Sequence, residues 1–261
     1  MEKPQMMKAV LTVKEKIYLT PHYIRVILEG EDLSIYEAAN VGDNNKIVIP
    51  KDKLQKIQLP DGPPKGASDF YIRTYTMRYL DVNKNEMAID FVMHGETGPA
   101  SSWAIHAEKG DELGVLMKAK RKPIVQPADW YLLIGDHTAL PVISTILENL
   151  PATTKGKVLL EVHSSEDVIL LQKPAGVEIK WIFNSNPGET APLLEAFQTE
   201  EIPDMESKFV YAAAEYHTIK EIQESLRSNP KLERKDWYAF SYWKYGIAED
   251  ASAMERRAIS K

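Results

Sequence analysis

Hydrophobic and polar positions follow different periods in the two halves of the chain. From about residue 8 to residue 120, short stretches alternate apolar and polar side chains, as in residues 23–28. Further strands are predicted over 70–79 and 87–94, with a hairpin loop at 81–86. Many short strands with few helices favour an all-β fold, an antiparallel barrel.

The period changes after Pro127. Residues 130–134 form a continuous apolar strand, and Ile143, Ile146, Leu147 and Leu150 then fall on one face of a helix. The pattern repeats, with strands predicted at 158–162, 177–183, 208–212 and 237–242 and helices around 192–197 and 218–227. This alternation predicts a doubly wound α/β domain with a mostly parallel sheet. We therefore expect two domains, residues 1–122 and 128–261.

Composition narrows the function classes. The chain has 261 residues and no cysteine, which excludes disulfides, thiolate zinc sites, iron–sulfur clusters and a cysteine nucleophile. Its formal charge of −6 argues against a nucleic-acid partner, because phosphate binding needs a basic surface. The sequence has neither a signal-peptide pattern nor an apolar run long enough to span a bilayer, and its six histidines lack metal-ligand spacing. We expect a cytoplasmic monomer with no membrane contact and no protein-bound metal.

The densest group of chemically useful side chains is the segment Arg73-Thr74-Tyr75-Thr76-Met77-Arg78. In a strand, the residues at 73, 75 and 77 share one face, and those at 74, 76 and 78 share the other. An arginine binds a pyrophosphate in bidentate fashion, a tyrosine ring stacks on a flat heterocycle, and a threonine hydroxyl bonds a ring nitrogen. The segment therefore suits a flavin, although a polar barrel strand with surface ion pairs is the alternative.

A second segment, residues 90–103, runs from a strand through two glycines into a helix. Pro99 suits the first helical turn, and the free backbone amides near Ser101 and Ser102 form a site for an anion such as pyrophosphate. By itself this helix start is ordinary, but its combination with the arginine-tyrosine-threonine strand indicates a nucleotide cofactor. The ring of Trp103 either stacks on a ligand or packs against the barrel, and His94 either bonds a cofactor or is a structural strand residue.

In the second half, a buried strand ends in Gly135-Asp136-His137-Thr138-Ala139-Leu140-Pro141 and a helix follows. Thr138 is a candidate helix cap, and Pro141 fits the first turn. No Gly-x-Gly-x-x-Gly pattern is present, which excludes a dinucleotide enzyme built on that motif. Asp136 is either a ligand-binding residue or a structural acid of the loop.

These motifs together resemble the siderophore-interacting proteins, and the resemblance covers roughly residues 8–250. It is carried by Arg-x-Tyr-Thr-x-Arg at 73–78, Asp-Phe-Val-x-His-Gly at 90–95, Gly-Pro-Ala-Ser at 98–101, Gly-Asp-x-Thr-Ala-Leu-Pro at 135–141 and Tyr-Trp-Lys-Tyr-Gly at 242–246. It implies an antiparallel Greek-key FAD-binding barrel followed by a nicotinamide-binding α/β domain. It also implies FAD as cofactor and NADH or NADPH as electron donor.

Carried over by position, the resemblance implies two sets of cofactor-binding residues. The FAD set is Arg73, Thr74, Tyr75, Thr76, Asp90, Phe91, Val92, His94, Gly98, Pro99, Ala100, Ser101 and Ser102. The nicotinamide set is Asp136, Thr138, Glu215 and Trp243. The chain departs from the family at Asn184, where an arginine is common, and this weakens the case for a bound 2′-phosphate.

The resemblance implies a ferric-siderophore reductase. Siderophores bind iron through hard oxygen donors that favour Fe³⁺ over Fe²⁺, so reduction releases the metal. Fixed positive charge would attract an anionic chelate, and the candidates are Lys46, Lys120, Arg121 and Lys244, each of which is otherwise a surface residue. The alternatives are a general flavin reductase with ferredoxin as its protein partner, and a chelate-binding flavoprotein without turnover.

Overall fold

The computed structural model describes residues 6–52, 55–59, 69–96, 98–118, 123–249 and 251. The chain divides into two compact units, Met1–Pro123 and Ile124–Lys261. Each unit has a hydrophobic core of its own, as expected of a domain. No helix among the described residues is long and apolar enough to cross a membrane.

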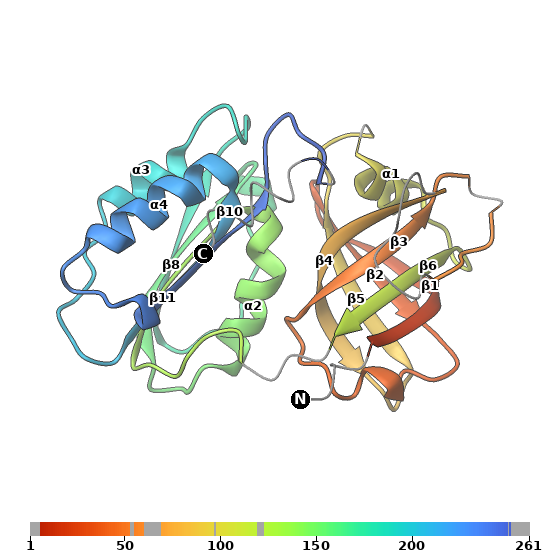
Figure 1. The fold of residues 1–261 in the computed structure, drawn as a ribbon, viewed down its shortest axis with the longest axis horizontal. Coiled ribbons are helices and arrows are strands. Elements are labelled where there is room, and N and C mark those ends of the chain that lie inside the picture. Colours follow the sequence, from red (N-terminus) through yellow and green to blue (C-terminus); the bar gives the residue numbers. More distant parts are fainter. Residues whose placement is uncertain are drawn as a thin grey trace. The chain divides into compact units, whose positions relative to one another are not determined.

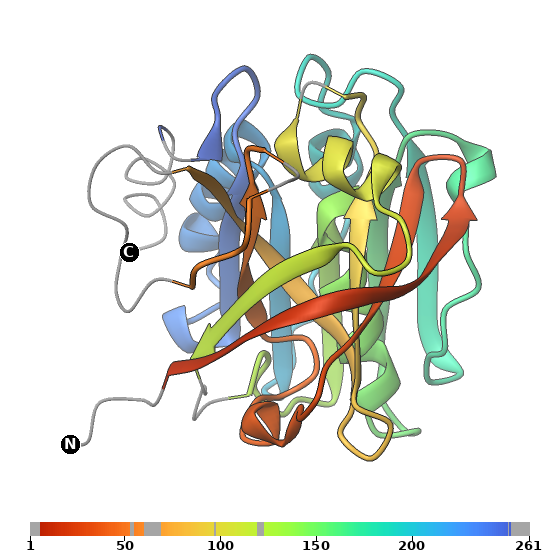
Figure 2. The same ribbon diagram turned by 90° about the vertical axis from the view of Figure 1, so that its right-hand side faces the viewer.

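The first unit is a closed barrel of six antiparallel strands in the order β1-β2-β5-β4-β3-β6. Its elements are β1 (Met6–Thr20), β2 (Tyr23–Glu29), β3 (Asn44–Pro50), β4 (Phe70–Asp81), β5 (Glu86–Val92), α1 (Pro99–His106) and β6 (Glu112–Lys118). Strands β3, β4 and β5 are consecutive neighbours, and β6 returns to pair with β3, which is a Greek-key connection. In Figure 2 the long β1 strand crosses the barrel alongside β6.

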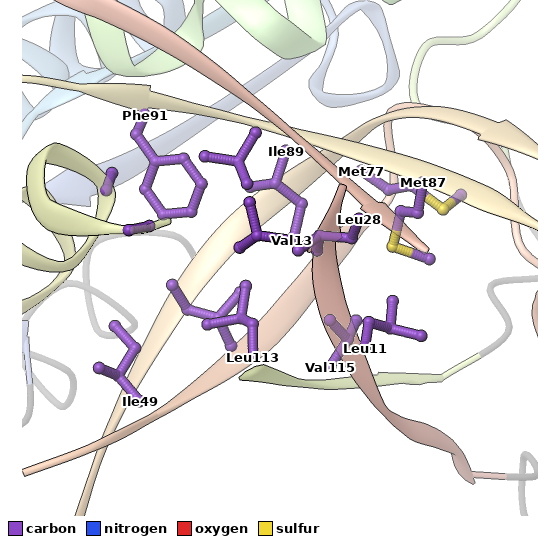
Figure 3. Packing of buried hydrophobic residues seen from close by; sticks show 14 of the residues in the cluster. Leu11, Val13, Leu28, Ile49, Met77, Met87, Ile89, Phe91, Leu113 and Val115 are labelled. Atoms are coloured by element: carbon purple, nitrogen blue, oxygen red, sulfur yellow. The ribbon is translucent and has the colours of Figure 1, made fainter. Parts of the chain in front are cut away.

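Alternate residues of the barrel strands point into a dry core. Leu28 of β2, Ile89 of β5 and Val115 of β6 are all fully buried, and Figure 3 shows their side chains together with those of the neighbouring strands. Helix α1 packs its alanine face on this core, through Ala100 and Ala104. Because a shift of one residue would turn the apolar side chains outward, this core holds the strand register that positions the polar residues of β4.

The second unit is a sheet of five parallel strands in the order β11-β10-β7-β8-β9. The strands are β7 (Trp130–Gly135), β8 (Lys155–Val162), β9 (Gly176–Phe183), β10 (Lys208–Glu215) and β11 (Trp237–Trp243), and the helices are α2 (Leu140–Asn149), α3 (Pro192–Gln198) and α4 (Tyr216–Ser228). Helices α3 and α4 lie on one face of the sheet and α2 on the other (Figure 1). The sheet is therefore doubly wound.

The chain enters this sheet at its centre. Strand β7 is followed outward by β8 and β9, and the chain then returns to β10 and β11 on the other side of β7. The order reverses between β7 and β10, and ligands of doubly wound sheets bind at the carboxyl ends of the strands beside such a reversal. The predicted fold class, an antiparallel Greek-key barrel followed by a doubly wound α/β domain, is confirmed.

Candidate functional site

Strand β4 carries the segment from which a flavin site was predicted. Met77 is buried in the barrel core, and Tyr75 packs against that core from the same side of the strand. Arg73, two residues earlier, donates from a guanidinium nitrogen to the Ile72 carbonyl at 2.8 Å. On the opposite side, the exposed Thr74 accepts a hydrogen bond from the Lys46 ammonium group of β3. Arg73 and Tyr75 therefore share one face of β4, as predicted from the strand period.

Three aromatic rings lie in a row between β4 and α1. The Tyr75 and Phe91 ring centroids are 4.6 Å apart, and those of Phe91 and Trp103 are 5.5 Å apart. Phe91 is fully buried, whereas Tyr75 and Trp103 keep part of their surface exposed. The buried Phe91 ring thus packs between the rings of Tyr75 and Trp103 and holds both in place. Of the two interpretations of Trp103, packing on the barrel is the one that the geometry favours.

The carboxylate of Asp90 is engaged by two residues of β2. Arg25 binds it in bidentate fashion, with Nε to Oδ1 at 2.7 Å and Nη2 to Oδ2 at 2.8 Å. The Tyr23 hydroxyl donates to Oδ2 at 3.0 Å. Only 1% of the Asp90 side chain is exposed. These contacts give Asp90 a role in fastening β5 to β2, and its predicted contact with FAD stays a prediction.

The turn before α1 presents backbone amides rather than side chains. Gly98 is the N-cap and makes no side-chain cap, Pro99 begins the helix, and the Ser102 amide donates to the Gly98 carbonyl at 2.8 Å. The Ser101 hydroxyl accepts from the His94 amide at 3.3 Å and donates to the Gly95 carbonyl at 2.7 Å. Ser101 therefore fastens the turn. The amides of Ala100 and Ser101, which have no partner inside the helix, are left for a ligand such as a phosphate.

The backbone at position 98 is closely packed against a neighbouring side chain. A methyl group there would collide with the imidazole of His94, which lies directly against the Gly98 backbone. This contact places His94 beside the start of α1. Ala100 is buried under the helix, and Val92 is half-buried at the end of β5. The segments 90–94 and 98–102, which sequence reasoning assigned to one site, thus touch through His94, Gly98 and Ser101.

Asn45 of β3 is a polar residue that the sequence analysis missed. It is 1% exposed, and neither its Oδ1 nor its Nδ2 has a hydrogen-bond partner among the described residues. It pairs directly with Tyr75 of β4, and directly opposed residues share one face of the ladder. A buried amide without a partner costs free energy unless a ligand or water satisfies it. This unsatisfied amide, the aromatic row and the free helix amides together fit a flat polar cofactor with a pyrophosphate, such as FAD.

In the second unit, Asp136 follows β7 at the point where the strand order reverses. One carboxylate oxygen accepts from the Thr138 amide at 2.9 Å and its hydroxyl at 2.5 Å, and the other accepts from the Trp243 indole at 2.6 Å. Asp136, not Thr138, is thus the cap of the turn 137–139, because its carboxylate is the acceptor. Burial raises the pKa of Asp136 above its usual value, and the hydrogen bonds from Thr138 and Trp243 oppose this rise.

The carboxylate of Glu215, at the end of β10, also accepts hydrogen bonds from backbone amides. Its carboxylate accepts from the amides of His217 at 2.5 Å and Thr218 at 3.3 Å, so it caps α4. It accepts in addition from the Tyr245 amide at 3.2 Å. Residues of three predicted segments, at 136, 215 and 243, are thus brought to the carboxyl ends of three adjacent strands. Their contact with a nicotinamide nucleotide stays a prediction.

Glu161 of β8 is the second residue that sequence reasoning missed. It is buried and accepts from the Leu193 amide at the start of α3 at 3.2 Å. Burial, together with the nearby negative charge of Asp136, raises the pKa of Glu161 to about 7. A charged residue inside the apolar run 158–162 was the available signal, since an unpaired acid is rarely buried without a specific role.

Two of the four predicted chelate-binding cations lie among the described residues, one in each unit. Lys46 bonds Thr74 on the barrel. The ammonium group of Lys244 lies 4.5 Å from the centre of the Tyr216 ring in the other unit. Lys120 and Arg121 lie outside the described residues.

The Greek-key barrel, with its half-buried Tyr75 near a helix start, and the doubly wound parallel sheet that follows it form a fold found among solved reductases. The ferredoxin reductase of carbazole 1,9a-dioxygenase shares this fold, with a TM-score of 0.62 at 14% identity over 91% of this chain and 69% of that one. Residues 12–119 match the siderophore-interacting FAD-binding domain, and residues 128–246 match the siderophore-interacting protein domain. The chain belongs to the siderophore-interacting protein family, as the motifs predicted.

Two relatives cover nearly the whole chain. The ferric vibriobactin reductase ViuB of Vibrio cholerae serotype O1 is 34% identical over 96% of this chain and 94% of its own length. The siderophore-interacting protein SipS from Aeromonas hydrophila superposes with a TM-score of 0.81 at 33% identity, over 97% of this chain and 98% of that one. The similarity therefore extends over both units.

Proposed function

We propose that this protein is a ferric-siderophore reductase that uses FAD and a nicotinamide donor in the cytoplasm. The observation that carries the proposal is the grouping of Tyr75, the unsatisfied Asn45 amide and the free amides at the start of α1 in one barrel. The similarity to a ferric vibriobactin reductase along both units supports the same substrate class. In this proposal, residues 1–122 bind FAD and residues 128–261 bind the nicotinamide nucleotide.

The barrel residues would each meet a different part of the cofactor. The exposed face of the Tyr75 ring would stack on the flavin, and Asn45 and Thr76 would bond its polar edge. Arg73 and the first-turn amides of α1 would bind the pyrophosphate, with Thr74, Val92 and His94 lining the remainder. Bound FAD would supply the conversion of a two-electron donor into single-electron steps.

In the second unit, the capped turn at Asp136 would receive the nicotinamide nucleotide at the carboxyl ends of the strands. The hydrogen bond from Trp243 holds the Asp136 carboxylate in place, and Glu215 holds the start of α4. These residues would therefore act mainly by fixing the backbone on which the donor lies. Positive charge from Lys46, Lys120, Arg121 and Lys244 would attract an anionic ferric chelate, and one-electron reduction would weaken its hold on iron.

The test is anaerobic reduction of the purified, FAD-loaded protein. Separate samples receive NADH, NADPH or reduced ferredoxin, and bleaching of the flavin absorbance is followed before an iron complex of a hydroxamate or a catecholate is added. We expect a nicotinamide nucleotide to bleach the flavin and the ferric complex to restore its colour. Bleaching by reduced ferredoxin alone would replace the proposed donor, and reduced protein that never reoxidises with a ferric chelate would refute the substrate.

Arg73 offers a direct test of the cofactor site. Loss of its guanidinium in Arg73→Ala should raise the FAD dissociation constant at least about tenfold, since a charge-assisted bond to phosphate is worth about 1.5–3 kcal/mol. The exposed Lys84, in the hairpin loop between β4 and β5, provides the control, and Lys84→Ala should bind FAD with little change. Equal effects of the two substitutions would contradict the assignment.

The chelate-binding lysines are tested by steady-state kinetics. Lys46→Ala and Lys244→Ala should raise KM for an anionic ferric chelate more than KM for a neutral quinone acceptor, because only the former is attracted by charge. The exposed Lys109, in the loop before β6, provides the control substitution Lys109→Ala. Equal KM values for the anionic chelate in all three variants would remove these lysines from the proposal.

A further inference from the structure

The loops that follow β8 and β9 are where the two nicotinamide donors differ. In a doubly wound sheet the pyrophosphate lies at the first strand-to-helix turn, here residues 135–141, and the adenosine ribose reaches the end of a neighbouring strand. An arginine there receives the 2′-phosphate of NADPH, whereas NADH presents a free 2′-hydroxyl. The side chains after β8 and β9 therefore decide the donor, given the proposed function.

Neither loop carries a permanently charged cation that could bind a phosphate. Residues 163–172 and 184–191 contain no lysine and no arginine. They do contain the exposed carboxylates Glu166 and Glu189. A phosphate monoester carries a charge of about −1.5 to −2 at neutral pH, so it would meet repulsion here rather than a partner.

The two arginines that the structure describes in this unit lie at the other end of the sheet. Arg234 has its guanidinium 4.3 Å from the Trp237 ring and donates to the Trp237 carbonyl at 3.0 Å. Arg227 lies 5.8 Å from the same ring. Trp237 is the first residue of β11, and the strands are parallel, so both arginines are at the amino ends. Among the described residues of 124–261, no arginine reaches the carboxyl ends.

Asn184, directly after β9, is committed to its own loop. Its Oδ1 accepts from the Asn186 amide at 2.9 Å and the Thr190 hydroxyl at 2.8 Å. Its Nδ2 donates to the Thr190 carbonyl at 3.4 Å, and the residue is buried. The side chain holds the loop closed and points no donor outward. Position 184 is thus a structural one in this chain.

We infer that the nucleotide domain selects NADH and rejects NADPH, because the loops after β8 and β9 oppose a 2′-phosphate. The carboxylate of Glu189 accepts a hydrogen bond from the Tyr245 hydroxyl at 2.5 Å. This bond holds the negative charge of Glu189 in the loop after β9, where it would repel a 2′-phosphate. The exposed Ser185, next to Asn184, is then the position at which a single cation would change the preference.

The test is direct binding to the FAD-loaded full chain by titration calorimetry, with no turnover. AMP is compared with 2′-phospho-AMP, and NAD⁺ with NADP⁺. We expect the phosphorylated ligand of each pair to bind at least about tenfold more weakly, since one like-charge contact of about 1.4 kcal/mol has that effect. Equal or tighter binding of the phosphorylated ligands would overturn the inference.

The variant Ser185→Arg places a guanidinium beside the ribose position. It should improve NADP⁺ binding at least fivefold, an order-of-magnitude expectation for one exposed charge-assisted contact, and the gain should fall with added salt. The control Ser225→Arg adds the same charge to the exposed face of α4 and should leave the ratio of the NADP⁺ and NAD⁺ dissociation constants unchanged. If this ratio of dissociation constants is unchanged in both variants, the adenosine ribose does not lie beside Ser185. That result would overturn the inference that the loops after β8 and β9 select the donor.

The outcomes separate this inference from the proposed function. If NADPH reduces the flavin as readily as NADH and binds as tightly, only the donor selectivity is wrong. If neither nucleotide binds and only reduced ferredoxin bleaches the flavin, the nicotinamide donor is wrong and the selectivity falls with it.

Discussion

The indole nitrogen of Trp243 donates to the carboxylate of Asp136 at 2.6 Å, and this bond ties the end of β11 to the turn after β7. Strand β10 lies between these two strands, so the contact bridges across the end of a neighbouring strand. The two residues are 107 positions apart in sequence. Two motifs that are far apart in the chain therefore form one cluster at the carboxyl edge of the sheet.

Replacement Trp243→Phe should destabilise the second unit. It keeps an aromatic ring but removes the donor to a buried carboxylate, and an interaction of this kind is worth about 1–3 kcal/mol. Four of the five tryptophans belong to residues 124–261, so denaturation followed by tryptophan fluorescence reports on this unit. Trp181→Phe, which removes a partly exposed indole from β9, is the control. An equal free energy of unfolding for both variants would contradict the role given to the bond.

Glu161 should make the stability of the second unit depend on pH. Its pKa is about 7 in the folded protein against 4.5 as the ordinary value, because burial disfavours the charged form. The group therefore contributes its full stabilisation below about pH 4.5 and loses it as the pH rises through about 7. At about 1.4 kcal/mol per pKa unit, the loss is about 3 kcal/mol.

The variant Glu161→Gln tests this dependence, since an amide does not titrate. Relative to the parent protein, its free energy of unfolding should rise by about 3 kcal/mol between pH 4.5 and pH 8. The exposed Glu224 of α4 provides the control Glu224→Gln, for which the difference from the parent should stay nearly constant. A flat difference for both variants would show that Glu161 titrates as an ordinary carboxyl.

The fold was predictable because its signals are local. The apolar run 130–134 and the helical stripe that follows it are properties of neighbouring residues, and they predicted β7 and α2 directly. Strand β1 was harder to delimit, because its 15 residues mix lysines with apolar side chains and its pairing with β2 shifts register twice. An irregular ladder blurs the period of two on which strand prediction rests.

The site was predictable only where a motif is contiguous. The faces of β4 followed from strand geometry, and Arg73 and Tyr75 do share one face. The partners of Asp90 and Asp136 were not predictable, since Arg25 and Trp243 reach them through tertiary contacts 65 and 107 residues away. Asn45 was missed for a similar reason, because only the packed barrel shows that its amide is buried without a partner.

The ion pair of Arg25 with Asp90 should stabilise the barrel. The variant Arg25→Met keeps most of the side-chain volume and leaves a nearly fully buried carboxylate without its cation, which costs about 3 kcal/mol. The more exposed pair of Lys14 with Glu86 provides the matched control, and Lys14→Met should cost much less than Arg25→Met, because solvent screens this pair. Hydrogen exchange of the β2 and β5 amides measures both effects. Similar protection of these amides from exchange in the two variants would mean that the buried ion pair does not stabilise the barrel.

The loop after β9 should depend on a glycine at position 188. Gly188 has a φ of +89°, and an added methyl group would lie 2.5 Å from the Tyr245 ring. Gly246 also has a positive φ, of +71°, but nothing lies within 4 Å of its added methyl group. Gly246→Ala should therefore cost only the backbone strain, about 1 kcal/mol, whereas Gly188→Ala must in addition displace Tyr245 from Glu189.

A double-mutant cycle separates these two costs. In a Tyr245→Gly background all three colliding atoms of residue 245 are gone, so Gly188→Ala should cost no more than Gly246→Ala does in the parent, about 1 kcal/mol. In the parent background it should cost at least about twice as much, because the ring and its hydrogen bond are displaced as well. Denaturation followed by tryptophan fluorescence gives the four free energies. If Gly188→Ala costs the same with and without Tyr245, the ring does not hold the loop, and the placement of Ser185 and Glu189 beside the donor loses its support.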